Sequence, residues 1–422
     1  MSEADVEALR TARRDLEHTI SEIRDVPGYE NFLAPPVFAD VAAEASLTPV
    51  VYLAAAQAGG LALVVRGEDI AHVALEGLRA GELRERVMAH FGVYAAYRAD
   101  GARRPEWDCS LDEMTGWLWS TAMEPVLAVL AGSAEVVLVP GGLLGLLPLH
   151  AAWTPDPRRP TGRRYALDEL AIGYTPNVRA LAVARANARK AHADRALVFA
   201  EPSPVPAGAL PSARYEAAVV RSGFPEVSVV GGGAATRRAF GRRAPEADVL
   251  HLACHGYANL ADPLDSGLLV AGGRITLRDL LDDYRLQVRL AVLSACETGL
   301  PGTDLPDEVV ALPTGLLQAG VAGIVASGWS VPDRATAMLM AEFYRRWARD
   351  TIPPGQALRA AQQWLRDTTT QDKREHWRRL AGQPWLPDEV AAYFEYSTVG
   401  SDPGGRDYAG IHFWGAFAHV GA

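Results

Sequence analysis

The chain has 422 residues, of which 49% are hydrophobic and 22% charged, values that are ordinary for a soluble globular protein and argue against extended disorder. Its formal net charge of −10 argues against a broad nucleic-acid-binding face, which needs clustered basic residues. Three cysteines cannot form a disulfide framework, and the N-terminus lacks the basic start and apolar core of a signal peptide. We therefore expect a cytoplasmic protein. We also expect no membrane segment, because the most apolar stretch, residues 136–149, is short and interrupted by prolines.

The first predicted element is an amphipathic helix over residues 3–24. Its apolar residues recur at steps of three or four, as one face of a helix requires: Val6, Leu9, Ala12, Leu16, Ile20 and Ile23. Such a face must pack on something, either the body of the protein or a helical repeat lying upstream. We treat residues 1–30 as a separate N-terminal segment.

Residues 31–190 are predicted to form a first half of the protein. Three apolar runs between residues 50 and 74, separated by glycines, predict a meander of strands. Helical patterns follow at residues 79–98 and 110–131, and residues 135–139 predict a strand buried on both faces. The glycines after this strand suggest a phosphate loop, but no Lys-Ser/Thr pair follows them, so a tight turn is favoured.

Residues 191–422 are predicted to form the second half, in which strands and helices alternate. Strands are expected at residues 196–200, 227–230, 249–253, 290–294, 321–327 and 411–420. Helices are expected between them, at residues 211–222, 233–244, 276–284, 306–319, 334–349 and 355–367. This alternation predicts an α/β fold with a mostly parallel sheet covered by helices on both faces.

Two of these strands end in reactive residues. His255 follows the strand at 249–253, and Cys296 follows the strand at 290–294. Functional groups collect beyond the carboxyl ends of strands in such a sheet, so adjacent strands would place an imidazole base beside a thiol. The glycines after each residue allow sharp turns, and the backbone N–H groups of Gly256 and Cys296 could then face a developing oxyanion.

The boxes around these two residues resemble a known family. His-Leu-Ala-Cys-His-Gly at 251–256 and Leu-Ser-Ala-Cys-Glu-Thr-Gly at 293–299 are similar to the CHAT family of caspase-like proteins, relatives of separases, caspases and gingipains. The stretches at 139–153, 313–333 and 412–414 extend the resemblance to about residues 20–420. The resemblance implies a caspase-like fold, a degenerate first half, and a cysteine peptidase that uses Cys296 and His255 without a cofactor.

Two neighbours of His255 and the remaining cysteine of the chain have less specific readings. His251 and Cys254 could belong to a zinc site, but residues 251 and 254 lie on opposite faces of a strand and no Cys-x-x-Cys partner exists. We therefore predict no metal, a packing or hydrogen-bonding role for His251, and a small buried hydrophobe at Cys254. Cys109 lies in the first half and is interpreted as structural.

Three residues are candidates for the S1 pocket, which receives the side chain before the cleaved bond. Asp333 could supply a carboxylate there, as in the resembling separases, or could simply cap a helix. Ser294 stands where related enzymes that prefer arginine or lysine often carry an acid, and Asp265 is a further acid that could line the cleft. We expect a basic or unbranched P1 side chain rather than aspartate.

The function that follows is a cysteine endopeptidase whose partner is a protein or peptide substrate. The alternative is a catalytically silent caspase-like scaffold that binds partners. The resemblance also implies a latent or regulated protease in bacterial defence or signalling, released by an activating sensor or a helical-repeat partner.

Overall fold

The protein is described from a computed structural model, which covers residues 3–27, 29–30, 32, 34, 37–257, 259, 262–294 and 312–422. Its centre is an eleven-stranded sheet with the strand order β3-β2-β1-β4-β7-β16-β15-β14-β10-β8-β9. Apart from the antiparallel β1–β2–β3 meander and the antiparallel β15–β16 pair, neighbouring strands in this sheet run parallel. The predicted α/β fold with a mostly parallel sheet is confirmed.

One strand from the end of the chain joins the two parts of the sheet. β16 (Phe417–Gly421) pairs in parallel with β7 (Ala171–Tyr174) and antiparallel with β15 (Gly323–Ser327). Strands from the two predicted halves therefore belong to a single sheet. The sheet is continuous because β16 lies between β7 of the first half and β15 of the second.

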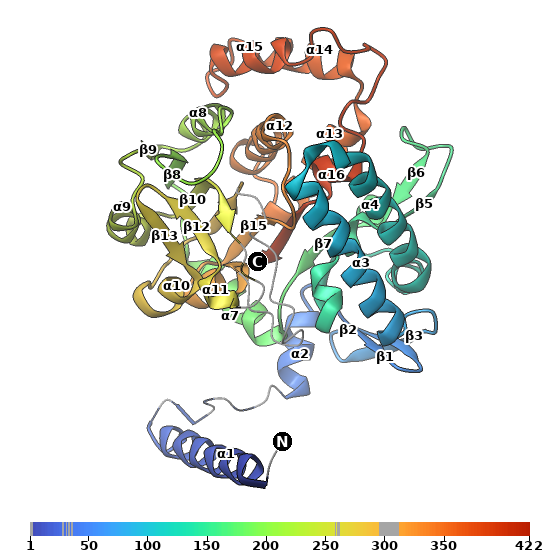
Figure 1. The fold of residues 1–422 in the computed structure, drawn as a ribbon, viewed down its shortest axis with the longest axis vertical. Coiled ribbons are helices and arrows are strands. Elements are labelled where there is room, and N and C mark those ends of the chain that lie inside the picture. Colours follow the sequence, from blue (N-terminus) through green and yellow to red (C-terminus); the bar gives the residue numbers. More distant parts are fainter. Residues whose placement is uncertain are drawn as a thin grey trace.

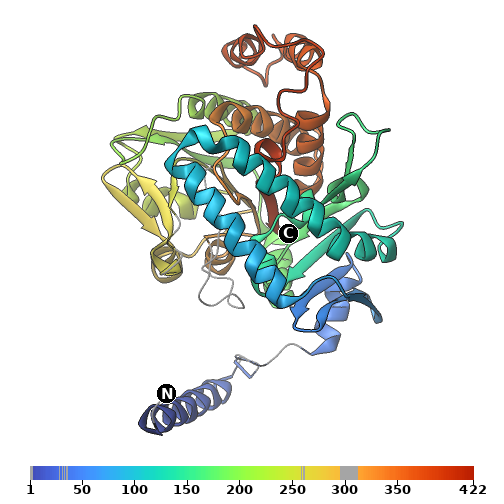
Figure 2. The same cartoon turned by 45° about the vertical axis from the view of Figure 1, so that its right-hand side comes forward.

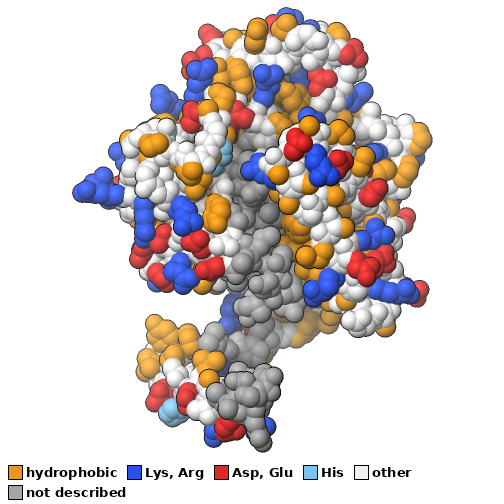
Figure 3. Space-filling model, viewed as in Figure 1, with side chains coloured by type: hydrophobic (Ala, Val, Ile, Leu, Met, Phe, Trp, Pro, Cys, Tyr) orange, Lys and Arg blue, Asp and Glu red, His pale blue; other side chains and the backbone are white. Residues whose placement is uncertain are grey.

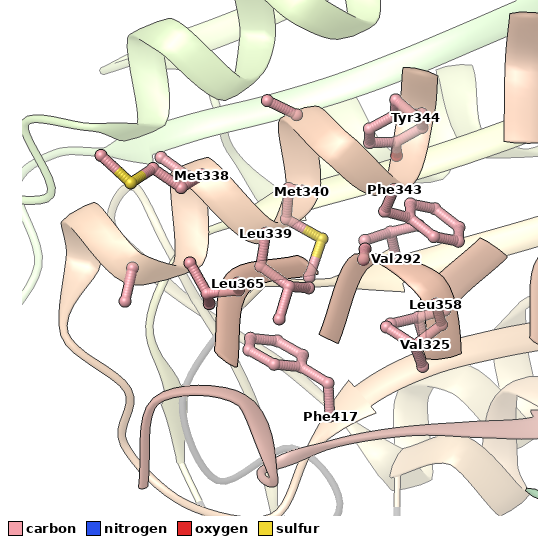
Figure 4. Close-up of a cluster of buried hydrophobic side chains, with 14 of the residues drawn as sticks. Val292, Val325, Met338, Leu339, Met340, Phe343, Tyr344, Leu358, Leu365 and Phe417 are labelled. Atoms are coloured by element: carbon pink, nitrogen blue, oxygen red, sulfur yellow. The ribbon is translucent and has the colours of Figure 1, made fainter. Parts of the chain in front are cut away.

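Helices cover both faces of the second part of the sheet. α8 (Ala213–Gly223), α12 (Asp333–Tyr344) and α13 (Pro354–Asp367) pack on one face. Figure 4 shows side chains of α12 and α13 meeting Val292 and Val325 of the sheet. The opposite face is covered by α9 (Arg237–Arg243), α10 (Leu277–Asp283) and α11 (Leu312–Ala319). The mostly apolar central strands of this part are thus buried on both sides, as parallel strands require.

The first part of the sheet is built from β1 (Val50–Ala56), β2 (Gly59–Arg66), β3 (Asp69–Leu75), β4 (Glu135–Pro140) and β7. One face is covered by α3 (Ala80–Ala99), α4 (Arg104–Leu118) and α5 (Glu124–Val129). α3 and α4 run side by side across the molecule in Figures 1 and 2. On the other face, α2 (Phe38–Ala45) and α7 (Val178–Lys190) pack on β1 and β4.

Several predicted elements differ from the observed ones. The helix expected at 110–131 begins earlier and is interrupted by a π turn at Trp119–Met123, just before Pro125, which cannot continue an α-helical ladder. The strand expected at 411–420 is α16 (Ile411–Trp414) followed by β16. Two short helices, α14 (Thr370–Leu380) and α15 (Asp388–Tyr396), form an unpredicted hairpin far from the sheet (Figure 1).

The predicted N-terminal helix is confirmed as α1 (Glu3–Arg24). In Figures 1 and 2 it lies apart from the body of the protein, and its Leu16 is 58% exposed. Figure 3 shows hydrophobic side chains gathered on one side of this helix. The structure therefore does not use the apolar face of α1 to cover the body. Among the described residues, no helix combines the length and apolar composition needed to cross a membrane.

Three buried histidines favour their neutral form. Burial lowers the pKa of His90, His150 and His419 to about 4, and Arg289 adds to this effect at His419. At His150 burial outweighs the hydrogen bond to the Gly415 carbonyl, which by itself raises the pKa. Nε2 donates to the Gly415 carbonyl at 3.0 Å, and Nδ1 accepts from the Tyr174 hydroxyl at 2.8 Å. A neutral imidazole thus donates at Nε2 and accepts at Nδ1, so both ring nitrogens have a partner without a charge.

We expect acid to destabilise the protein before its carboxylates titrate. A histidine whose folded pKa lies below its unfolded value of 6.5 stabilises the fold above pH 6.5, and this contribution is lost as the pH falls toward 4. Each such histidine should cost about 2 kcal/mol of unfolding free energy at pH 5 relative to pH 7.5. Denaturant unfolding at both pH values measures this. His150→Gln should show a smaller pH effect than wild type, because its buried imidazole is removed. An equal pH effect in His150→Gln and wild type would contradict the assignment.

Candidate active site

The two strands that carry the reactive boxes are neighbours. β10 (Val249–Ala253) pairs in parallel with β14 (Leu290–Leu293). Partners in this register, such as Leu252 and Leu293, are 41 positions apart in the sequence. His255 and Cys296 are separated by the same number of positions. The expected adjacency of the strands is confirmed, while Cys296 itself lies outside the described residues.

His255 follows β10 at the carboxyl edge of the sheet and is partly buried. Its Nε2 lies 2.7 Å from the carbonyl oxygen of Gly208, in the loop between β8 (Arg195–Pro202) and α8. A carbonyl oxygen can only accept a hydrogen bond, so Nε2 must carry the proton. In neutral His255, Nδ1 is then the nitrogen with a lone pair, and this atom is the candidate base.

Gly208 was not predicted from the sequence. It acts through its backbone carbonyl, which every residue possesses, and it lies 47 positions before His255. The signal that the sequence offered was its place in the loop after the strand predicted at 196–200. The structure adds that this strand, β8, pairs with β10. That loop begins at the same sheet edge as His255.

Gly256 begins the two-residue strand β11 (Gly256–Tyr257), which pairs with β12 (Gly267–Val270). The N–H of Leu269 donates to the carbonyl of His255 at 2.8 Å. In an antiparallel pair this pattern makes Gly256 and Leu268 a non-hydrogen-bonded pair, so the N–H of Gly256 points away from β12. The geometry is compatible with the predicted oxyanion role of Gly256, and that role stays a prediction.

The three candidate S1 residues have different environments. Asp333 is the first residue of α12, and its Oδ2 accepts the backbone N–H of Ser212 at 2.8 Å. Ser294 lies at the end of β14, with Oγ 3.5 Å from the Leu252 carbonyl. Asp265 forms an ion pair with Arg274 at 3.1 Å, which compensates its charge locally. Their roles in substrate binding stay predictions.

The two residues that flank the base are integrated into the core. His251 is fully buried, with Nδ1 3.0 Å from the Tyr344 hydroxyl and Nε2 3.1 Å from a carboxylate oxygen of the buried Glu216. Cys254 is 2% exposed and packs among apolar side chains. Both readings from the sequence are confirmed. Within the part of the chain that the structure describes, no three His, Cys, Asp or Glu residues form a cluster that could hold a metal ion.

The segment that follows β15 is supported by helices from the first half. The indole N–H of Trp329 donates to the His412 carbonyl at 3.0 Å, and the ring meets Trp107 of α4 edge to face. The N–H of Ser330 donates to the hydroxyl of Tyr94 of α3 at 2.8 Å. The segment after β15 therefore forms a wall that is held by Tyr94 and Trp107, residues to which the sequence pattern gave no role at the site.

An apolar cavity of about 110 Å³ lies beside this wall, where β4, β7 and β15 end. Gly328 and Trp329 line it on one side, and the His150–Tyr174 pair lines it on another. None of its described lining residues is acidic, so this cavity offers no charge to a basic substrate side chain.

A family model and several solved structures are similar to this chain. A sequence model described as the CHAT domain matches residues 112–422. No curated protein matches the chain.

Among solved structures, a separase–securin complex from Saccharomyces cerevisiae is similar with 8% identity and a TM-score of 0.53. The match covers 77% of this chain and 29% of the matched chain, so this chain spans less than a third of that protein's length. At this low identity the likeness concerns the fold alone. The Arg-specific cysteine proteinase gingipain R matches with 9% identity and a TM-score of 0.36, over 74% of this chain and 66% of that chain. The pro- and mature domains of Porphyromonas gingivalis RgpB match with 9% identity and a TM-score of 0.38, over 74% and 68%.

Proposed function

The chain belongs to the CHAT-domain family, and from this premise we propose that it is a cysteine endopeptidase with Cys296 as nucleophile and His255 as base. The observation that carries the proposal is the 2.7 Å contact between His255 Nε2 and the Gly208 carbonyl. It leaves Nδ1 as the acceptor at the end of β10, beside the strand that precedes Cys296. A base in this tautomer is what a neighbouring thiol needs to become a thiolate at neutral pH.

In the proposed reaction, Nδ1 of His255 takes the proton from the Cys296 thiol, and the thiolate attacks the substrate carbonyl. The imidazolium is stabilised because its Nε2–H still donates to Gly208. Backbone N–H groups of Gly256 and Cys296 stabilise the oxyanion, and His255 then protonates the leaving amine. Water hydrolyses the acyl-enzyme, with His255 again as base. No cofactor is proposed.

The proposed setting is a cytoplasmic, latent protease in bacterial defence or signalling. The exposed apolar residues of α1, such as Leu16, favour a helical partner as the activator. The alternative is a silent scaffold with the same fold, and it predicts an unreactive Cys296.

A peptide with a thiol-reactive warhead should separate the two functions. We expect Cys296 to be alkylated about tenfold or more faster than the exposed Cys109, because the proposed base His255 would activate the Cys296 thiol. His255→Gln should slow labelling at Cys296 and leave labelling at Cys109 unchanged, as measured by peptide mass spectrometry over time. Equal rates at the two cysteines, or no effect of His255→Gln, would favour the scaffold.

A further inference from the structure

The loop of residues 203–212 carries the Gly208 carbonyl that faces His255. It contains three prolines, at positions 204, 206 and 211, besides the glycine at 208. Proline lacks the N–H that backbone ladders use, so such a loop must be fixed by contacts with other parts of the protein. Two carboxylates make such contacts.

The first carboxylate belongs to Glu201. The pairing of β8 with β9 (Glu226–Gly232) shifts register between Ala200 and Pro202, so Glu201 is an extra residue in β8. Its φ of 47° lies in the left-handed region, which non-glycine residues rarely adopt. A bulge of this kind redirects a side chain, and here the redirected carboxylate accepts the N–H of Leu210 at 2.9 Å. A strained residue of this type persists only where the surroundings hold it, and such residues concentrate at functional sites.

The second carboxylate belongs to Asp333, which comes from a distant part of the chain. It accepts the N–H of Ser212 at 2.8 Å, at the point where the loop enters α8. Ser212 is fully buried, and its hydroxyl lies 2.7 Å from the Tyr393 hydroxyl of α15. The end of the loop is therefore fixed by groups from two other helices.

We infer that Glu201 and Asp333 are positioning residues that hold the Gly208 carbonyl against His255. They accept backbone N–H groups two and four residues after Gly208, Glu201 from the end of β8 and Asp333 from α12. Because the Gly208 carbonyl dictates which imidazole nitrogen carries the proton, the two carboxylates set the tautomer of His255 without touching substrate. The inference rests on the proposed role of His255 as base, and it gives Asp333 a task other than lining the S1 pocket.

The two roles of Asp333 make different demands on its chemistry. A backbone N–H is satisfied equally by a carboxylate or by the oxygen of a side-chain amide, so positioning tolerates asparagine. An S1 acid acts through its charge, so asparagine would selectively impair cleavage after arginine or lysine. The same reasoning applies to glutamine at Glu201.

Kinetics of four variants test the inference on peptides with basic and neutral P1 residues. Glu201→Ala and Asp333→Ala should lower kcat by about tenfold or more and change KM by less than about threefold. The reason is that each change misplaces the base and leaves the substrate-binding residues in place. Glu201→Gln and Asp333→Asn should keep kcat within about threefold of wild type for every P1 residue. Asp402→Ala is the matched control, since its carboxylate also accepts a backbone N–H, that of Gly404, in an exposed turn outside α8, α12 and α15. It should leave kcat unchanged.

A second measurement does not depend on proteolysis. NMR of protein with ¹⁵N-labelled histidine reports which ring nitrogen carries the proton, and the His255 signals are assigned by their absence in His255→Gln. They should show the proton on Nε2 in wild type and in the amide variants. In the two alanine variants they should show a mixture of both tautomers. If wild type cleaves nothing but these tautomers change as stated, the proposed function fails and the positioning role stands. Two results would overturn the inference in a wild type that cleaves through Cys296. In the first, the alanine variants keep both the Nε2–H tautomer and the wild-type kcat. In the second, the amide variants lose as much kcat as the alanine variants.

Discussion

Replacing Cys296 or His255 by alanine is expected to abolish peptide cleavage while leaving the fold intact. Without the thiol no acyl-enzyme can form, and without the imidazole the thiol stays protonated at neutral pH. Removal of a general base alone costs about 10²–10⁴-fold in rate. The measurement is kcat/KM on a cleaved peptide, with circular dichroism and thermal unfolding to verify that each variant is folded.

Two matched variants serve as controls for this result. Cys109→Ser removes the exposed cysteine of α4, and His192→Ala removes an exposed histidine just after α7. Both should cleave at the wild-type rate. Undiminished cleavage by purified Cys296→Ala protein would show that the nucleophile has been assigned to the wrong residue. The natural substrate can be sought by comparing new N-termini in cells that express wild type or Cys296→Ala.

Replacing Asp168 by alanine is expected to cause a large loss of stability, about 3–5 kcal/mol. Asp168 is in α6 (Ala166–Glu169), and its carboxylate lies 2.7 Å from the guanidinium of Arg366 in α13. Both side chains are almost completely buried, and Arg366 also packs over the rings of Tyr165 and Trp414. Among the residues that the structure describes, truncation would leave the buried guanidinium with Asp367 as its remaining ion-pair partner.

Denaturant unfolding measures this loss as a shift of the transition. The pair links residues of the first part of the sheet to α13, which covers the second, so one transition at lower denaturant is expected rather than two. Glu395→Ala is the control, because its ion pair with Arg378 lies at the surface and should contribute little. An Asp168→Ala protein as stable as Glu395→Ala would mean that the buried pair does not hold the two parts together.

Local patterns in the sequence predicted most elements that position the site. The runs predicted at 249–253 and 290–294 are strands β10 (Val249–Ala253) and β14 (Leu290–Leu293), because a short, mostly apolar run fits a strand buried on both faces. The α14–α15 hairpin was missed. Its buried Trp377 and Phe394 pack on one another across the hairpin, and neither helix carries a pattern long enough to be distinguished from a loop.

The candidate site was predicted less completely than the strands. His255 and Cys296 stand in boxes with reactive side chains followed by glycines, so their residue types alone indicate chemistry. Asp333 was singled out as an acid, but its partner, the N–H of Ser212, lies 121 positions away. Nothing in the local sequence of either residue indicates that contact.

The sequence by itself determined which residues could carry the chemistry, since side-chain type and spacing are written in the chain. It also determined that two apolar strands end at them. Only the tertiary structure decided that β10 and β14 are neighbours, that β16 joins both parts into one sheet, and that the Gly208 carbonyl faces His255. The physical reason is that backbone groups are the same in every residue. Pairing between distant strands and contacts with a carbonyl are therefore chosen by the packing of the whole chain, not by any local pattern.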